Sequence, residues 1–331
     1  MLLYIILALS AFVLTLIGSR LMIVALRKRT PPIDIRVLRN QKPAEAPSGG
    51  IAVAFILIAC LLGVNIGYSI ILGMLLLIAI SSLHEMIDIP LPIRILAQIM
   101  AITLPLSHTD MALFSPYLLP VFWDKLIIGT LWIWFINTMT AMDKADGLYA
   151  AESISIATGL CLLAVFMGAF PTPLSSYSLI TAAALTGFAW WNWPPAKIRL
   201  GDAGCVPVAF LLGYLLLLVA RSGYAYISLI LPAYILVDGS MTMFKRIVSR
   251  RHFSVPYYYQ KAHLQGRPKS TIVRLVAATN MLLIFLALRT ALYPDNAFFN
   301  LAISYLCVLI VLRFFAKRPS HSTPASGNAN P

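Results

Sequence analysis

Long runs of apolar residues follow one another along most of this chain, and short polar segments separate them. A helix rises 1.5 Å per residue, so roughly 20 apolar residues cross the hydrocarbon core of a bilayer. The pattern predicts about eleven helices, which we place at 2–26, 50–64, 66–83, 93–107, 124–142, 151–169, 174–191, 203–220, 223–243, 271–290 and 296–315. We therefore expect an all-α fold, a polytopic integral membrane helical bundle of about 10–11 transmembrane helices.

The spacing of these runs also predicts the domain organisation. The longest loops hold only about 25 residues, too few for an independent soluble core. We expect a single transmembrane domain over 1–318 and a disordered tail over 319–331, which is rich in Pro, Ser, Asn and Ala. The first helix has no basic segment and no small-residue cleavage signature before Arg20, so it is typical of a retained span.

Composition supports the membrane assignment. Hydrophobic residues make up 60% of the 331 and charged residues 11%, whereas soluble domains carry about 25% charged residues. The four cysteines are isolated and have no zinc-ligand spacing, so apolar packing is their expected role.

The basic residues predict the orientation. With alternating spans, most of them fall in loops on one side, which is the cytoplasmic side by the positive-inside rule. The N-terminus is then outside and the C-terminus cytoplasmic. The net charge of +13 reflects this topology and attraction to anionic lipid or phosphate, and it does not indicate nucleic-acid binding. The residues on the basic side are Arg27, Lys28, Arg29, Arg36, Arg39, Lys42, Lys197, Arg199, Lys245, Arg246, Arg250, Arg251, Lys261, Arg267, Lys269, Arg313, Lys317 and Arg318.

Four polar segments fall on that same side: 84–88, 143–146, 201–204 and the 245–270 loop. Only twelve residues of the chain are acidic, and carboxylates near hydrocarbon are costly unless they line a polar cavity with a function. The neighbouring glycines let the backbone approach a phosphate or an ion closely. We therefore expect these segments to assemble one site at the membrane surface.

Each of these residues also has a structural interpretation. Asp143 or Asp146 alone could cap the sixth helix, and Asp202 could cap the eighth, because Asp is favoured in a first turn. The pair His84-Glu85 could be a solvated helix end, and His263 an ordinary surface histidine.

The ordered motifs resemble those of the polyprenyl-phosphate N-acetylhexosamine-1-phosphate transferases (glycosyltransferase family 4), nearly along the whole chain. The segment from Pro43 to Gly50 resembles the family's first cytoplasmic loop. His84-Glu85-Met-Ile-Asp88, with Arg94 and Gln98, stands at the Asp-Asp-rich loop. Further motifs follow at Asp143-Lys-Ala-Asp146-Gly-Leu, at Asn192 through Gly204, and at Asp238, Arg246, Tyr259-Gln260 and His263. The paired Asp-x-x-Asp-Gly-Leu and Gly-Asp-x-Gly motifs carry most of the specificity.

Some positions depart from the family pattern, so the chain resembles the family in the way that a divergent member would. His84-Glu85 replaces two adjacent aspartates, and Lys144 replaces the first glycine of Asp-Gly-x-Asp-Gly. Thr140 replaces an asparagine, Cys205 replaces a serine, and only His263 remains of a His-rich motif.

The resemblance implies transfer of a HexNAc-1-phosphate from a UDP-sugar to undecaprenyl (polyprenyl) phosphate at the cytoplasmic face, with release of UMP. This reaction initiates a lipid-linked cell-surface glycan such as lipopolysaccharide O-antigen or a cell-wall intermediate. The implied catalytic residues are Asp143, Asp146, Glu85 and Asp88. The implied substrate-binding residues are Asn137, Gly147, Asn192, Gly201, His263 and Lys144.

The resemblance also implies a cation, because the nucleophile and the electrophile are both anionic. Asp202 and Asp146 are the expected ligands of Mg²⁺, or of Mn²⁺ in its place. The expected partners are a UDP-HexNAc donor, a polyprenyl phosphate acceptor and membrane lipid, in the inner (plasma) membrane of a bacterium, with a homodimer as one arrangement.

A second hypothesis stays open, in which the chain is a non-catalytic homologue or a transporter of a phosphorylated or lipid-linked ligand. A transporter is expected to place ionisable residues near the bilayer midplane, often with internal repeats. Here the motif carboxylates fall at one surface and no repeat is visible, which favours the enzyme. The replaced Asp-Asp pair is the main argument for a non-catalytic homologue.

Overall fold

The computed structural model describes residues 2–29, 48–108, 120–167, 173–249 and 255–317. Its named helices are α1 (Leu2–Arg29), α2 (Gly50–Leu62), α3 (Tyr68–Ile87), α4 (Leu91–Ser107), α5 (Val121–Ala141), α6 (Leu148–Met167), α7 (Pro173–Asn192), α8 (Asp202–Val219), α9 (Ala225–Ile230), α10 (Ala233–Val248), α11 (Tyr258–Leu264), α12 (Lys269–Leu292) and α13 (Ala297–Ala316). The described residues contain no β-strand, only an isolated bridge between Ser48 and Arg199. The all-α expectation is confirmed.

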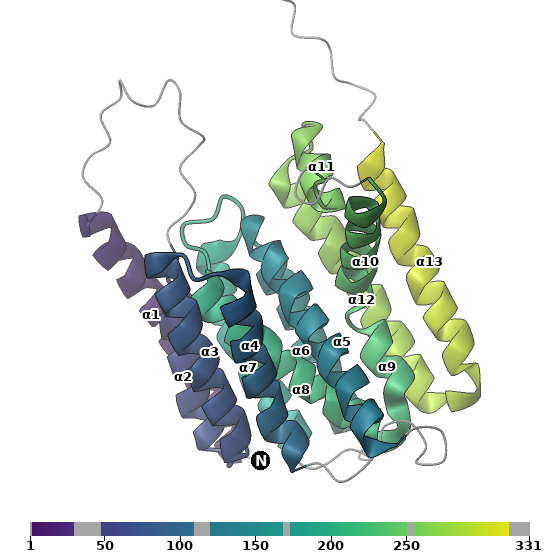
Figure 1. Ribbon diagram of the computed structural model, residues 1–331, viewed down its shortest axis with the longest axis horizontal. Coiled ribbons are helices and arrows are strands. Elements are labelled where there is room, and N and C mark those ends of the chain that lie inside the picture. The colour runs from purple at the N-terminus through teal and green to yellow at the C-terminus, as the bar shows by residue number, and fades with distance from the viewer. Residues whose placement is uncertain (1, 30–47, 109–119, 168–172, 250–254, 318–331) are drawn as a thin grey trace, which may run out of the picture.

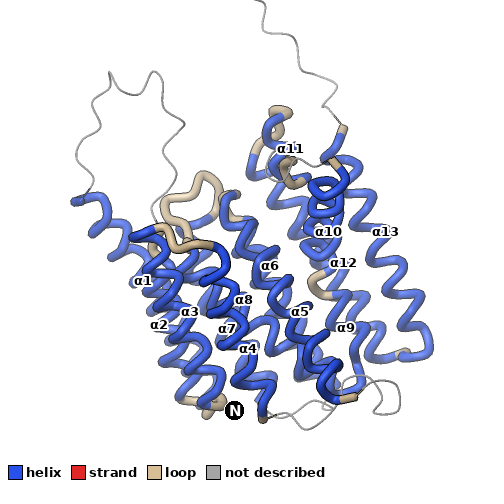
Figure 2. The backbone as a smooth tube through the Cα atoms, in the orientation of Figure 1, coloured by secondary structure: helices blue, strands red, loops and turns tan. Residues whose placement is uncertain are grey.

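The long helices lie side by side in one bundle, with α1 to α3 at one edge and α12 and α13 at the other (Figure 1). The N-terminus lies at one end of the bundle, and the loop after α7 and helix α11 lie at the opposite end (Figure 2). All eleven predicted segments form helix. The ninth differs, because a turn at 231–232 divides it into α9 and α10. Pro232 has no backbone N–H and cannot continue the hydrogen-bond ladder of α9.

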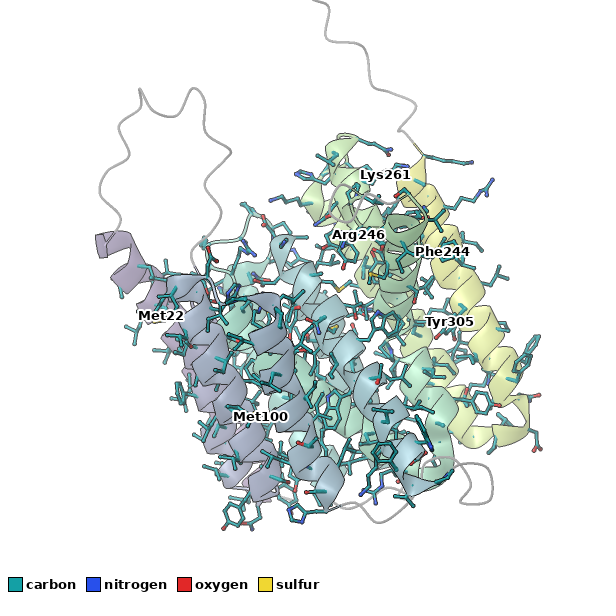
Figure 3. All side chains as sticks on the ribbon, viewed as in Figure 1. Met22, Met100, Phe244, Arg246, Lys261 and Tyr305 are labelled. Carbon is teal, nitrogen blue, oxygen red and sulfur yellow. The ribbon has the colours of Figure 1, made fainter. Side chains whose placement is uncertain are left out.

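Within the described residues, seven segments are long and apolar enough to cross a membrane by length and composition, and α2 and α4 are shorter apolar helices. Many large apolar side chains point outward from the bundle, among them Leu9 on α1, Met100 on α4 and Phe285 on α12. Figure 3 shows such side chains along the sides of the bundle, while Arg246 and Lys261 lie at the end near α11. An apolar surface of this extent faces lipid, so this is a multi-pass membrane protein.

Helix α8 is the packing centre that positions the site. Almost all of its side chains are buried, and it contacts α3, α5, α2, α6 and α7. The Trp132 indole of α5 donates to the Phe210 carbonyl oxygen of α8 at 3.1 Å, and the two rings stack with their centroids 5.0 Å apart. This packing holds the first turn of α8 at the bundle end that carries the polar segments.

Several expectations lie outside the described residues. They are the disordered tail at 319–331, most of the first basic loop including Pro43, and the basic residues Arg250 and Arg251.

Candidate active site

The Asp143 carboxylate links the polar segment 143–146 to the segment 199–201 by hydrogen bonds. Asp143 lies in a short 3₁₀ turn, Met142–Lys144, and is 4% exposed. Its Oδ1 accepts a hydrogen bond from the Leu200 N–H at 3.2 Å, and its Oδ2 accepts one from the Gly201 N–H at 2.9 Å. The Arg199 guanidinium lies 3.4 Å from Oδ2 and also donates to the Asp143 carbonyl oxygen at 3.0 Å. Asp143 therefore holds the 199–201 segment beside the end of α5.

Asn192 makes a second link between the same two motifs. Its Oδ1 accepts a hydrogen bond from the Gly147 N–H at 3.1 Å, and its Nδ2 donates to the Ile198 carbonyl oxygen at 2.8 Å. Gly147 has a φ of 75°, and a Cβ there would lie 2.9 Å from Pro194 Cδ. The predicted substrate-binding residues Asn192 and Gly147 thus define the shape of the site through the backbone.

The end of the first loop joins this framework by backbone hydrogen bonds. Gly49 and Gly50 donate to the carbonyl oxygens of Arg199 and Leu200, both at 2.9 Å. Glu85 accepts a hydrogen bond from the Ala203 N–H at 3.1 Å and from the Ser48 hydroxyl at 3.0 Å. The Glu85 carboxylate therefore satisfies a free N–H at the start of α8, where a negative charge also complements the helix dipole.

Asp202, the first residue of α8, faces α3 and α4. Arg94 Nη2 donates to Asp202 Oδ2 at 2.6 Å, and His84 Nε2 lies 3.8 Å from the same oxygen. Arg94 Nη1 lies 3.1 Å from His84 Nε2. The three side chains are partly exposed at the same end of the bundle.

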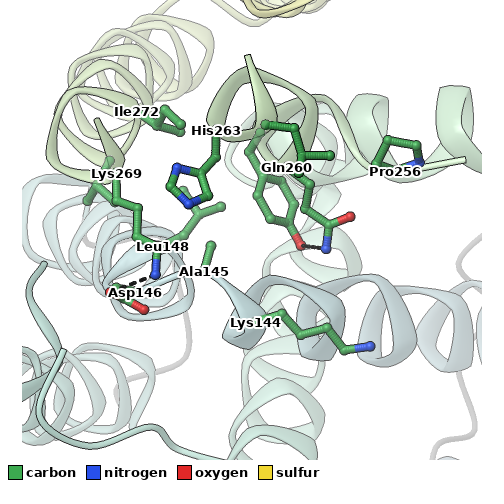
Figure 4. A pocket seen from close by; sticks show the side chains of 12 residues that line it. Lys144, Ala145, Asp146, Leu148, Pro256, Gln260, His263, Lys269 and Ile272 are labelled. Carbon is green, nitrogen blue, oxygen red and sulfur yellow. Dashed lines mark hydrogen bonds and ion pairs between the residues drawn. The ribbon is translucent and has the colours of Figure 1, made fainter. Parts of the chain in front are cut away.

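Asp146 faces a cavity of about 470 Å³ at this end of the bundle. Its Oδ2 accepts hydrogen bonds from Lys269 Nζ at 3.1 Å and from the Ala196 N–H at 3.3 Å. Figure 4 shows the Lys269–Asp146 pair with His263 beside it, and Lys144 on the other side of the opening. A second cavity of about 290 Å³ also has Asp146 and Lys269 in its lining. This ion pair therefore stands between two open spaces.

Helix α11 forms one wall of the larger cavity. Burial raises the pKa of Tyr259 well above its usual value, so the phenol stays protonated and donates to the Ala141 carbonyl oxygen at 2.6 Å. Gln260 Nε2 lies 3.4 Å from the same phenol oxygen. His263 Nδ1 donates to the Arg267 carbonyl oxygen at 3.3 Å, and the His263 ring lines the cavity.

The prediction that four polar segments meet at one end of the bundle is confirmed. Contacts join Glu85, Asp143, Asp146, Asn192, Gly147 and Gly201 in one framework, and Lys144 and His263 line its cavity. Asp202 follows Gly201 directly and pairs with Arg94. Two residues lie apart from those contacts. Asp88 ends α3 in the left-handed region with an exposed side chain, and Asn137 donates to Gln98 Oε1 at 2.8 Å. The catalytic and binding roles assigned to these residues stay predictions.

Sequence reasoning did not assign a site role to Ser48, Arg94, Arg199 or Lys269. Each contacts a motif carboxylate in the structure. The sequence position of Lys269 could have indicated a site role. Lys269 follows Pro268 and is the first residue of α12, so it lies at a helix start on the basic side. A motif carboxylate in a nearly uncharged bundle also needs a partner, which points to the nearest basic residues.

The donor set does not fit a preformed magnesium site. Mg²⁺ takes carboxylate oxygens in an octahedral shell, yet Asp202 and Asp146 are each bound by a basic side chain. Among the described residues, no group of three His, Cys, Asp or Glu side chains is arranged so that it could hold a metal ion.

A glycine substitution tests the close packing of the framework. Gly201 has a φ of 68°, and a Cβ there would lie 1.8 Å from Ser48 Oγ and 2.4 Å from Glu85 Oε1. We expect Gly201→Ala to lower the melting temperature of the purified protein, because backbone strain of about 1–3 kcal/mol adds to the clash.

Gly266→Ala is the matched control. Gly266 also has a positive φ, 91°, but nothing lies within 4 Å of its Cβ position. Its melting temperature should fall less, and equal losses in the two variants would contradict the packing described for Gly201.

Comparison with known proteins supports the resemblance seen in the motifs. Residues 67–220 match the model of glycosyl transferase family 4. A probable undecaprenyl-phosphate N-acetylglucosaminyl 1-phosphate transferase of Bacillus subtilis is 27% identical over 209 residues, which are 60% of this chain and 57% of that protein. A phospho-N-acetylmuramoyl-pentapeptide-transferase of Paenarthrobacter aurescens is 29% identical, covering 41% of this chain and 43% of that protein.

A phospho-N-acetylmuramoyl-pentapeptide-transferase of Helicobacter pylori is 24% identical and covers 57% of this chain and 64% of that protein. The chain thus spans about half the length of the curated relatives that it matches. The matched segment runs from the start of α3 to the end of α8, and it contains Asp143, Asp146 and Asp202. Residues 67–220 are thus similar to glycosyl transferase family 4, and the resemblance expected from the motifs is confirmed.

Proposed function

We propose that this protein transfers a HexNAc-1-phosphate from a UDP-sugar to undecaprenyl phosphate at the membrane surface and releases UMP. The observation that carries the proposal is the framework in which Asp143 and Asn192 join two family motifs beside a cavity lined by Lys144, Asp146, His263 and Lys269. The cavity opens at the bundle end, where a water-soluble donor and a lipid phosphate can meet. The relatives named above carry the same class of activity in their names.

The chemistry needs cations more than it needs a base. An oxygen of the lipid phosphate attacks the phosphorus that carries the sugar, and the bond from that phosphorus to the bridging oxygen breaks, so that UMP leaves with the bond electrons. A phosphate monoester has its second pKa near 6, so it is largely dianionic at neutral pH. The barrier then comes mainly from bringing two anions together, which positive groups lower.

The residues of the cavity divide between positioning and charge. Asp143 uses both carboxylate oxygens on backbone N–H groups, which favours a positioning role for it. Lys269 and Lys144 would contact the phosphate groups of the donor and spread the developing charge. His263, which shares their cavity, would hold a phosphate or the sugar. Asp146 would hold Lys269 in place until the substrate arrives.

The sequence also led to expectations about the metal, the donor sugar, the glycan product and the oligomeric state. The expected Mg²⁺ or Mn²⁺ at Asp202 and Asp146 is not part of the proposal, because a basic side chain already pairs with each carboxylate, and no step above depends on a metal. The donor is a UDP-HexNAc, and the product starts a lipid-linked glycan of O-antigen or cell-wall type in a bacterial inner membrane. A homodimer has no support among the relatives and is not part of the proposal.

A direct assay tests the function. The purified protein in detergent is mixed with undecaprenyl phosphate and UDP-GlcNAc that carries a radiolabelled sugar, and label is followed into the lipid phase while UMP is measured. We expect equal amounts of labelled lipid and UMP. UDP-GalNAc and a 6-deoxy-HexNAc nucleotide should be tried in parallel, and no transfer from any donor would favour the non-catalytic hypothesis.

The orientation of the bundle gives a separate prediction. From the basic residues and the positive-inside rule, we expect the end of α13, and with it the site, to lie in the cytoplasm. A reporter enzyme that is active only outside the cytoplasm, fused after Pro331, should give no signal. The same reporter fused before Leu2 should be active, and the reverse pair of results would contradict the orientation.

A further inference from the structure

The Asp202 carboxylate is already paired with a positively charged side chain. Arg94 Nη2 lies 2.6 Å from Asp202 Oδ2, which is a short charge-assisted hydrogen bond. Arg94 reaches it from the first turn of α4, while Asp202 begins α8. These elements come from distant parts of the chain, and both lie within the matched family segment. The contact is therefore part of how the bundle end is assembled.

His84 decides how firmly Arg94 is held there. Its Nε2 lies 3.1 Å from Arg94 Nη1 and 3.8 Å from Asp202 Oδ2. A guanidinium only donates hydrogen bonds, so the shorter contact requires Nε2 to be the acceptor. An imidazole that accepts at Nε2 cannot at the same time donate that nitrogen's proton to Asp202. His84 therefore acts on Arg94 and holds the guanidinium against the carboxylate.

The neighbouring carboxylate is not available as a second ligand. Glu85 accepts hydrogen bonds from the Ala203 N–H and the Ser48 hydroxyl, at 3.1 and 3.0 Å. Both contacts fix it to the start of α8 and to the end of the first loop. A divalent cation at Asp202 would then have one carboxylate, and that carboxylate is already neutralised by a guanidinium.

We propose that Arg94, held by His84, is the resident cation of Asp202 in this protein, and that the pair keeps divalent metals from binding Asp202. Mg²⁺ requires direct contact with carboxylate oxygens and loses its waters reluctantly. It would have to displace Arg94 and then sit beside its positive charge. The replacement of the family's two aspartates by His84-Glu85 would then explain why Asp202 pairs with Arg94 and not with a divalent cation. The inference concerns the same site as the proposed function, but its test measures metal binding and not transfer, so the two can fail separately.

The test is a titration of Mn²⁺ into the purified full-length protein, with free Mn²⁺ followed by electron paramagnetic resonance. We expect Arg94→Gln to bind one Mn²⁺ at least tenfold more tightly than the unmodified protein. The gain should disappear in Arg94→Gln with Asp202→Asn, and excess Mg²⁺ should compete for it. Arg274→Gln is the matched control, because it removes one exposed arginine from α12 and should change nothing.

A second variant covers the case in which Arg94→Gln does not fold. His84→Asp keeps Arg94 but places two carboxylates against one guanidinium, so a negative charge is left in excess and Mn²⁺ binding should again tighten. The proposal is overturned if the unmodified protein binds Mn²⁺ tightly through Asp202, as shown by loss of binding in Asp202→Asn. It is also overturned if the folded Arg94→Gln and His84→Asp variants bind Mn²⁺ no more tightly than the unmodified protein.

Discussion

Asp143→Ala should lower the stability of the protein by about 3–5 kcal/mol, which is the range for removing one partner of a buried charge pair. The carboxylate is almost fully buried and accepts hydrogen bonds from the Leu200 and Gly201 N–H groups. Its loss leaves both donors without this acceptor and frees the 199–201 segment to move. Thermal melting of the purified variant in detergent measures the effect, and transfer activity should fall with it.

Two comparisons separate this role from that of a catalytic base. Asp143→Asn keeps the shape and one acceptor oxygen, so it should lose less stability than the alanine variant. Asp295→Ala removes an exposed aspartate from the short turn before α13 and should melt like the unmodified protein. If Asp143→Ala melts normally and loses only activity, the carboxylate acts in the chemistry and not in positioning.

The helices could be read from the sequence because the bilayer imposes one length and one composition on every span. Each predicted run formed a helix, from α1 with its outward-facing Leu9 to α13. The break before α10 was less visible, because the run of apolar residues continues through Pro232. A hydrophobic pattern indicates that a segment is buried in lipid or protein. It does not indicate that one residue, here Pro232, lacks the backbone N–H that a continuous helix needs.

The site was predictable in its location and only partly in its contacts. The side on which the motifs lie follows from counting spans, so the meeting of Glu85, Asp143 and Asp202 could be foreseen. Their partners could not, because Arg94, Arg199 and Lys269 are single basic residues among many on the same side. The choice among them depends on helix rotation and on loop paths, which arise from packing around α8 and are not encoded in a local motif.

Lys269→Ala should reduce kcat/KM for transfer by about 10²–10³-fold, the scale for removing one main electrostatic stabiliser. Lys269 is the basic residue shared by the linings of both cavities, and in the absence of substrate its ammonium is held by Asp146 at 3.1 Å. Without it, the donor phosphates lose a positive contact and Asp146 adds a negative charge at the same place. The assay is the radiolabel transfer described above, at saturating and limiting UDP-sugar.

The double variant makes this prediction specific. If Lys269 acts on the substrate and Asp146 only holds it, Asp146→Asn with Lys269→Ala should be no worse than Lys269→Ala alone, because the repelling charge is gone. Lys269→Arg should recover part of the activity, since it restores the charge with a different shape. Lys261→Ala, an exposed lysine on the neighbouring helix α11, should remain fully active. A loss of less than threefold in Lys269→Ala would remove this residue from the site, and Lys144 would then be the remaining lysine that lines the larger cavity.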